Sequence, residues 1–190
     1  MRMKRILCLL ALLFVCAGNL CAFGAIDFTL GSGYVWYGRN DTKERNAALS
    51  GPSRIVLNTG AAFKYKIVEP VYLAAGVDVT LDFHWSGDDY VYLFDYAGLI
   101  GVQFYPGVAG LLVGVDYALG CRTDFYRVDG YAGRSSATEW GSGFKISVMY
   151  DFFHDEGKRL RPVAGASVRW MPRGNGSDTI LSAFFRLTLE

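Results

Sequence analysis

The sequence has few of the residues that build metal centres and disulfide frameworks. Its 190 residues include four Cys, two His and five Pro. Three of the cysteines, Cys8, Cys16 and Cys21, lie within the first 24 residues, so the remainder of the chain keeps Cys121 alone. A single cysteine forms no internal disulfide, and two histidines without a cysteine cluster indicate no metal site. We therefore expect neither a metal nor another cofactor.

The chain also lacks an excess of either charge, with a formal net charge of +1. Residues 1–24 contain Arg2, Lys4 and Arg5 and no acidic residue, so their removal takes away three positive charges and leaves −2. Nucleic-acid-binding proteins usually carry a clustered basic surface. No nucleic-acid partner is expected.

No apolar run after the first 24 residues is long enough for a membrane helix. Before that point, the apolar residues 6–17 follow a basic start, and the small residues Ala22 and Gly24 precede Ala25. This arrangement is typical of a secretory signal peptide, here covering residues 1–24. The run is shorter than the roughly 20 residues of a membrane-spanning helix, which argues against an N-terminal anchor helix. A lipid anchor on Cys21 is the other alternative. Residues 25–190 then form one exported domain.

What the sequence does have is strict alternation. Odd-numbered residues from 71 to 85 are all apolar, whereas the even-numbered ones between them include Gly76, Asp78, Asp82 and His84. Because successive side chains of a strand point to opposite faces, this segment has one apolar face and one small or charged face. The same pattern predicts strands at about residues 26–37, 55–67, 71–85, 90–105, 108–121, 140–152, 162–171 and 180–189. The large apolar face carries no charge in any of them, which indicates that lipid solvates it.

The connections alternate in length. Turns are expected at 68–70, 106–107 and 154–160, and connections at the opposite end at 38–54, 86–89, 122–139 and 172–178, of which 38–54 and 122–139 are the long ones. An even number of strands, short periplasmic turns and longer extracellular loops are typical of bacterial outer-membrane barrels. The sequence thus predicts an all-β fold: an eight-stranded antiparallel up-and-down transmembrane β-barrel in the bacterial outer membrane, with periplasmic termini and extracellular loops.

The four tryptophans support this topology. Trp36, Trp85, Trp140 and Trp170 all have outward parity and all fall at the loop end, as in an aromatic girdle at a membrane interface. The alternative is a soluble eight-stranded barrel of the lipocalin type, with its apolar face turned inward around a ligand. The ring of tryptophans at one end and the Gly- and Ala-rich opposite face argue against it.

Charged residues collect on the inward face. An eight-stranded barrel is just wide enough for its own side chains, so these charges must pair. We expect a packed salt-bridge plug, with a hydrated polar path as the alternative. The predicted lumen charge network comprises Asp27, Lys64, Lys66, Asp78, Asp82, His84, Asp95, Asp116, Arg122, Lys145, Asp151, Arg169 and Arg186.

One inward cluster invites an enzymatic interpretation. Asp82, His84 and Ser86 share a face of one strand, as the partners of a nucleophilic site would. Alternate residues of an extended strand are, however, too far apart for a tight triad. No catalytic residue and no enzymatic activity are expected.

At the level of architecture, residues 25–190 resemble the small eight-stranded outer-membrane proteins of the OmpW, OmpA and OmpX group, although no diagnostic motif carries the resemblance. It implies outer-membrane lipid and the barrel assembly machinery as partners. The C-terminus departs from the group, because the chain ends at Glu190 and such barrels usually end in an aromatic residue.

Two functions follow as hypotheses. Resemblance to OmpW-like barrels implies passive passage of small solutes, including hydrophobic ones, which would enter among the loops and leave sideways between strands. An apolar funnel of inward Val35, Val91 and Leu93 would favour this function, and we rank it slightly ahead. The alternative is an adhesin or immune-evasion barrel that binds a host surface molecule through loops 38–54 and 122–139.

Overall fold

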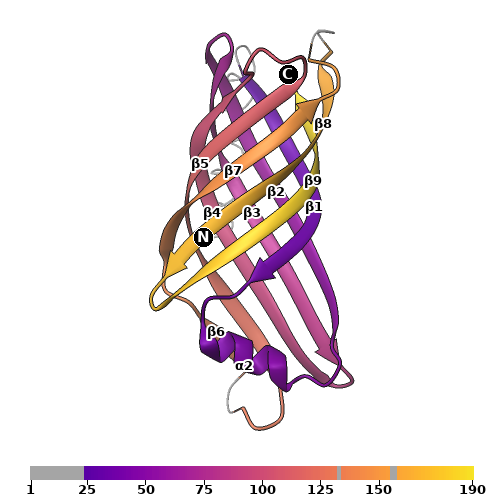
Figure 1. The fold of residues 1–190 in the computed structure, drawn as a ribbon, viewed down its shortest axis with the longest axis vertical. Coiled ribbons are helices and arrows are strands. Elements are labelled where there is room, and N and C mark those ends of the chain that lie inside the picture. Colours follow the sequence, from indigo (N-terminus) through magenta and orange to yellow (C-terminus); the bar gives the residue numbers. More distant parts are fainter. Residues whose placement is uncertain (1–23, 132–133, 155–157) are drawn as a thin grey trace, which may run out of the picture.

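The computed structural model describes residues 24–131, 134–154 and 158–190. The predicted signal peptide therefore lies outside the described residues, except for Gly24, the first residue of β1. Nine strands and one helix make up the described part (Figure 1). Their bounds are β1 Gly24–Trp36, α2 Asn40–Ala48, β2 Ser53–Val68, β3 Val71–Ser86, β4 Asp89–Phe104, β5 Leu111–Arg127, β6 Ser135–Ala137, β7 Gly141–Asp151, β8 Leu160–Arg173 and β9 Gly176–Leu189.

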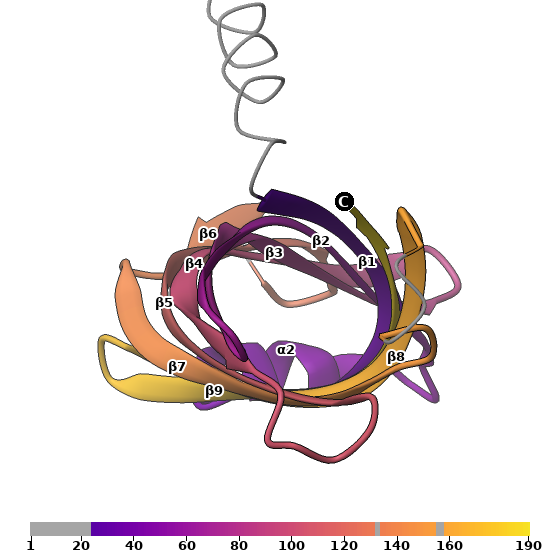
Figure 2. The same cartoon turned by 90° about the horizontal axis from the view of Figure 1, so that it is seen from above.

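Eight of the strands close into an antiparallel barrel, which confirms the predicted fold. Going around the ring, the order is β1, β2, β3, β4, β5, β7, β8 and β9, and β9 pairs with β1 to complete the closure. The short strand β6 lies outside this ring and pairs with residues Thr123–Phe125 of β5. Figure 2 shows the closed ring seen along its axis, with α2 lying across part of the opening at the far end.

The register of the strands sets the width of the barrel. Stepping from Trp36 on β1 to its partner on β9, then to the partner of that residue on β8, and so on around the ring, leads back to β1 at Ile26. The ring therefore closes with a stagger of ten residues, from 36 to 26. A closed ring of eight strands with such a stagger tilts its strands by about 40° and leaves an interior just wide enough for side chains. At Gly33 the neighbouring strand itself leaves no room for a side chain, because a Cβ there would lie 1.9 Å from the carbonyl oxygen of Leu181 on β9.

The outward face is apolar along the whole wall. Leu30, Ile100 and Val115 are 60%, 55% and 50% exposed, and buried inward residues alternate with such positions on every barrel strand. Ten residues of a strand tilted by about 40° rise about 25 Å along the axis, the height of the apolar band of an outer-membrane barrel. A continuous apolar band of this size is stable in lipid and not in water.

The helix content of the described residues is small. None of the helices there is long and apolar enough to cross a membrane. Helix α2 was not predicted, because its sequence is polar throughout and has no apolar stripe. Its termini carry favourable charges, with Asp41 in the first turn and Arg45 in the last, and the two side chains lie 3.7 Å apart as an i,i+4 pair.

Two segments predicted as loops are partly strand. β5 continues to Arg127 and does not end at residue 121, and β8 and β9 reach a tight turn at residues 174–175. The predicted connections 122–139 and 172–178 are therefore shorter than expected. The reason is that some charged residues of these segments keep inward parity and are buried inside the barrel, so their polarity does not mark exposed loop; these are Arg122, Asp124, Arg173 and Asp178.

Candidate functional site

The candidate site is the polar interior of the barrel together with its α2 end, where the β1–β2, β3–β4, β5–β7 and β8–β9 connections lie. The opposite end, with Gly24 and Glu190, is called the terminal end. Among the described residues, eight aspartates and eight Lys or Arg side chains are buried. These residues are Asp27, Asp78, Asp82, Asp95, Asp116, Asp124, Asp151, Asp178, Arg45, Lys64, Arg122, Lys145, Arg161, Arg169, Arg173 and Arg186.

Two ion-pair clusters lie in the terminal half of the lumen. At the terminal end, Arg161 Nη1 lies 3.2 Å from Asp151 Oδ2, and the same carboxylate accepts a hydrogen bond of 2.8 Å from the Tyr105 hydroxyl. Further in, Asp27 contacts Lys64 at 3.0 Å and Arg186 at 3.1 Å. Each buried charge in these clusters has an opposite charge beside it, which offsets the several kcal/mol that desolvation of an ion costs.

From the middle of the barrel, a chain of alternating charges runs towards the α2 end. Asp78 contacts Lys145 at 3.2 Å and Arg169 at 3.3 Å, and Arg169 contacts Asp95 at 2.5 Å. Asp95 in turn contacts Arg173 at 2.5 Å. Asp78 lies on β3 and Arg169 on β8, which are opposite each other in the ring. The pair therefore bridges the full width of the lumen.

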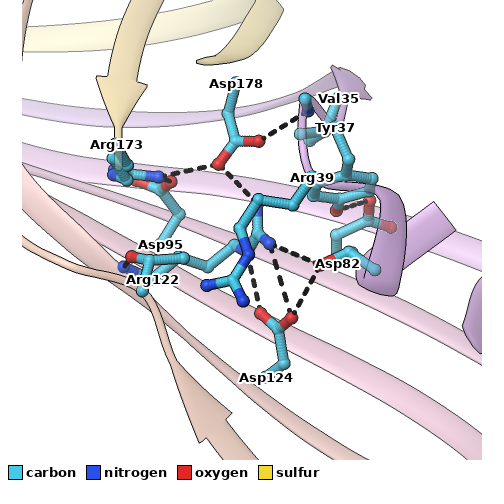
Figure 3. A network of polar contacts seen from close by, with 12 residues as sticks. Val35, Tyr37, Arg39, Asp82, Asp95, Arg122, Asp124, Arg173 and Asp178 are labelled. Atoms are coloured by element: carbon cyan, nitrogen blue, oxygen red, sulfur yellow. Dashed lines mark hydrogen bonds and ion pairs between the residues drawn. The ribbon is translucent and has the colours of Figure 1, made fainter. Parts of the chain in front are cut away.

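The series of alternating charges continues to helix α2, and Figure 3 shows its part from Asp95 to Asp124. Asp178 contacts Arg173 at 3.0 Å and also pairs with Arg122, which donates to Asp124 at 2.7 Å. Arg45 of α2 donates to the second oxygen of Asp124 at 2.7 Å. We call the whole series the lumen charge chain; it consists of Lys145, Asp78, Arg169, Asp95, Arg173, Asp178, Arg122, Asp124 and Arg45.

Contacts with Arg122 and Asp124 of the lumen charge chain hold helix α2 over the lumen. Besides the Arg45–Asp124 ion pair, Thr42 donates to Asp124 at 3.1 Å and accepts a hydrogen bond of 2.7 Å from Arg122. Thr42 is fully buried and the side chain of Arg45 is 6% exposed, although both belong to a surface helix. The helix therefore acts as a lid whose two inward side chains belong to the polar interior.

An apolar cluster packs beside these polar contacts of α2. Leu49, which follows α2, is buried against Val91, Leu93, Tyr126 and Val128. The inward Val91 and Leu93 do lie near the α2 end, as the predicted funnel requires, but they are completely covered. Val35, the third predicted member, packs in a separate cluster with Val56 and Ile180. The apolar residues at this end are thus divided between two buried clusters and do not line one open funnel.

A second polar cluster surrounds Asp82. Its carboxylate accepts hydrogen bonds from Arg54 at 2.7 Å and 3.0 Å and one from the Tyr37 hydroxyl. His84 Nε2 lies 3.0 Å from Asp82 as well. Ser86 donates instead to the carbonyl oxygen of Ser50 at 2.6 Å. The three residues considered for a nucleophilic site therefore do not form a relay, because the serine points to a different partner.

Twelve of the thirteen residues predicted for the lumen network are buried inside the barrel, and Asp116 among them lies in register beside Lys145. The exception is Lys66, which was wrongly placed in the lumen: its side chain is 45% exposed and pairs with Glu69 at the terminal rim. Lys66 has inward parity, but it lies where β2 leaves the barrel interior.

Sequence reasoning missed several buried charges. Arg173, Asp124 and Asp178 lie in segments predicted as loops, Arg161 next to a turn, and Arg45 on the unpredicted helix. The signal for three of them was continued parity: Asp124 follows Arg122 by two residues, and Arg173 follows Arg169 by four. Asp178 likewise precedes the inward Ile180 by two. For Arg45, nothing in the sequence indicates burial.

The four tryptophans lie on the outer wall towards the α2 end. Trp36, Trp140 and Trp170 are 49%, 62% and 40% exposed, and Trp85 is half-buried. Trp36 and Trp170 both pair with Thr179 of β9, one from each side. Trp140 packs edge-on against Tyr96. Their placement is that of rings at an interface between lipid and water.

Several solved structures have a fold similar to that of this chain. The Yersinia pestis attachment invasion locus protein Ail, in complex with the heparin analogue sucrose octasulfate, has a TM-score of 0.60 over 88% of this chain and 99% of that chain, at 8% sequence identity. A second structure of Ail gives 0.55 over 87% and 97%, at 10% identity. The Neisserial surface protein NspA gives 0.49 over 86% and 95%, at 9% identity.

These comparisons confirm the fold: the chain has the architecture of the small eight-stranded outer-membrane barrels. At such low identity the likeness concerns the fold alone. No protein-family model matches the chain, and no curated protein matches its sequence. Membership of the OmpW-like group in particular stays a prediction.

The Tyr37 hydroxyl gives the α2 end a testable pH dependence. Burial, together with the charge of Asp82 and the hydrogen bond to it, raises the pKa of Tyr37 well above its ordinary value of 10.0, against the opposing charges of Arg122 and Arg54. The unfolded chain then releases this proton near pH 10 while the folded barrel keeps it. The stability due to Tyr37 is complete below pH 10 and is lost as the pH rises from there towards the folded pKa.

We therefore expect the stability advantage of the natural chain over Tyr37→Phe to be smaller at pH 11 than at pH 9, by an amount on the order of 1 kcal/mol. Urea unfolding of both proteins in lipid vesicles at the two pH values measures this difference. All other titrating groups are common to the two proteins and cancel. An advantage that stays constant over this range would mean that Tyr37 titrates in the same way in the folded and unfolded chains.

Proposed function

We propose that the protein is an outer-membrane barrel whose lumen is closed to solutes, that lacks enzymatic activity, and that works by binding a host surface molecule at its α2 end. The observation that carries the proposal is the Arg169–Asp78 ion pair, which spans the lumen from β8 to β3 at 3.3 Å. Between this ion pair and the α2 end, the rest of the lumen charge chain and the lid helix occupy the path.

The lengths of the connections support the orientation. Those at the α2 end include residues 37–52 and 128–140, whereas those at the terminal end are residues 69–70, 105–110 and 152–159. Longer connections of outer-membrane barrels are extracellular and their short turns are periplasmic. The proposal accordingly places the α2 end outside the cell and both termini in the periplasm, with outer-membrane lipid around the wall. Insertion would depend on the barrel assembly machinery.

The surface of the α2 end supports a role in binding. Lys43 and Glu44 on the outer side of the lid are exposed, and so are Tyr131 and Arg134 beyond β5. Exposed tyrosines among small and charged residues are common on binding surfaces. Ail, whose name describes attachment and invasion, shares the fold and was solved with a heparin analogue bound. These facts favour an adhesin-type function over solute transport.

Passage of small hydrophobic solutes is the second candidate. It is favoured by the apolar cluster around Val91 and Leu93, which an apolar ligand could enter if Leu49 moved aside. One feature weighs against it: the lumen charge chain lies between the cluster and the terminal end. Every barrel strand pairs with both of its neighbours, but the β1–β2 ladder extends only from Gly24 and Tyr65 to Gly31 and Asn58, so residues 32–36 of β1 and 53–57 of β2 are not paired with each other near the α2 end.

A paired experiment separates the two functions. The barrel is reconstituted in liposomes to measure flux of small polar and apolar solutes, and it is displayed on a laboratory bacterium without adhesins to measure adherence to cultured epithelial cells. We expect flux equal to that of protein-free liposomes, and adherence that falls several-fold in a Lys43→Ser/Tyr131→Ser variant. Asp88→Ser, in the exposed β3–β4 turn at the same end, is the matched control and should keep full adherence.

Flux above that of protein-free liposomes would overturn the closed-lumen proposal. Adherence no greater than that of cells without the barrel would overturn the binding role. Heat-modifiable mobility on gels establishes that each variant is folded before either measurement.

A further inference from the structure

Two hollows lie near the α2 end, one on the outer wall and one at the rim. The first is an apolar groove of about 390 Å³ lined by Ile55, Phe83, Trp85 and Tyr92, all outward-facing residues of β2, β3 and β4. The second is a polar hollow of about 460 Å³ at the rim, lined by Tyr90, Tyr126, Arg127, Val128, Asp129, Tyr131 and Arg134. The groove is separate from the lumen charge chain and its lid, whereas the hollow borders the lid through Tyr126 and Val128, which pack against Leu49.

The two hollows are joined by stacked tyrosines. The rings of Tyr90 and Tyr92 lie 4.6 Å apart and 25° from parallel, so one surface of β4 runs from the groove into the hollow. Register places Tyr90 between Trp85 on β3 and Arg127 on β5. Phe83 packs edge-on against Tyr92 at 5.2 Å and holds the wall of the groove in place. An elongated molecule lying along β4 would thus contact both hollows.

The chemistry changes along this path in the way an amphiphile requires. Trp85 lies in the groove, and tryptophans of this kind mark the boundary between hydrocarbon and water. Arg127 and Arg134 lie in the hollow beyond that boundary, both are exposed, and Asp129 is the one carboxylate among the lining residues. Two guanidinium groups bind phosphate oxygens through paired, charge-assisted hydrogen bonds.

We infer that this surface is a binding site for a membrane lipid with an anionic phosphate headgroup. Its hydrocarbon chain lies in the groove of Ile55, Phe83 and Trp85, and its phosphate lies between Arg127 and Arg134. The remaining donors and acceptors of the hollow, Tyr131 and Asp129, bind the polar part of the headgroup. The site depends on the barrel lying in a bilayer, and it shares Tyr131 and Arg134 with the surface proposed to bind a host molecule.

Native mass spectrometry of the folded barrel tests the inference. The protein in detergent is mixed with phosphatidylglycerol or with zwitterionic phosphatidylcholine, and the lipid retained by the protein is measured. We expect preferential retention of phosphatidylglycerol, reduced roughly tenfold for each arginine replaced in Arg127→Gln and Arg134→Gln. Ile55→Trp, which fills the groove, should reduce retention of both lipids. Lys66→Gln removes an exposed cation at the opposite rim and should change nothing.

Equal retention of the two lipids, or unchanged retention in the Arg127→Gln/Arg134→Gln double variant, would overturn the site. Inorganic phosphate is also tested, as a competitor of phosphatidylglycerol. If millimolar phosphate displaces phosphatidylglycerol while Ile55→Trp has no effect, the hollow binds phosphate in general and the assignment to a lipid is wrong.

Discussion

Replacing Asp95 with Asn should destabilise the barrel by about 3 kcal/mol, a loss typical of breaking a buried ion pair. Asp95 accepts contacts of 2.5 Å from both Arg169 and Arg173, and all three side chains are buried. Asn keeps the shape and removes the charge, so two guanidinium groups lose their shared anion. Urea unfolding in lipid vesicles, followed by tryptophan fluorescence, measures the free energy of unfolding.

The matched control is Asp88→Asn, the same substitution at an exposed position of the β3–β4 turn, which should leave stability unchanged. Combining Asp95→Asn with Arg173→Met adds a test of coupling. Since Asp95 and Arg173 are direct partners, the double variant should lose less than the sum of the two single losses. Additive losses would show that the pair does not act as one unit in stabilising the lumen.

The barrel wall could be predicted from the sequence because its two faces meet opposite demands. Outward residues such as Leu30 and Ile100 contact lipid, and inward residues such as Asp78 and Lys145 must pair within a lumen that has no room for more than side chains. Period-two alternation follows from these demands and reveals the strands. Several of their ends were missed, since Arg122, Asp124 and Arg173 stay inside the barrel although they resemble loop residues.

The lid could not be predicted in the same way. Helix α2 contains no apolar stripe, and its burial depends on Thr42 and Arg45 finding Arg122 and Asp124 on a strand some 80 residues away in sequence. No local pattern encodes such a contact. Lys66 shows the converse error: parity correctly gives the face of a strand, but not the point at which that face leaves the barrel interior.

Replacing Arg45 with Ala should release the lid. The substitution removes the 2.7 Å ion pair to Asp124 and leaves Thr42 as the polar contact of α2 with the barrel. Loss of a buried charged partner costs about 3 kcal/mol, which corresponds to roughly a hundredfold faster exchange if the helix opens locally. Hydrogen–deuterium exchange of amides 40–48 measures this change. Lys43→Ala, an exposed position on the same helix, is the control and should leave exchange unaltered.

Solute flux through the Arg45→Ala variant separates the lid from the plug. The charge chain below α2 still contains the cross-lumen contact of Arg169 with Asp78, and that contact does not involve the helix. Fast exchange with no flux would therefore locate the barrier to solutes in the charge chain and leave the helix as a movable part of the binding surface. Fast exchange with flux would make α2 the gate of a conducting barrel, in which case solute passage would replace binding as the favoured function. Unchanged exchange would mean that Leu49, packed against Val91 and Leu93, holds the lid without help from Arg45.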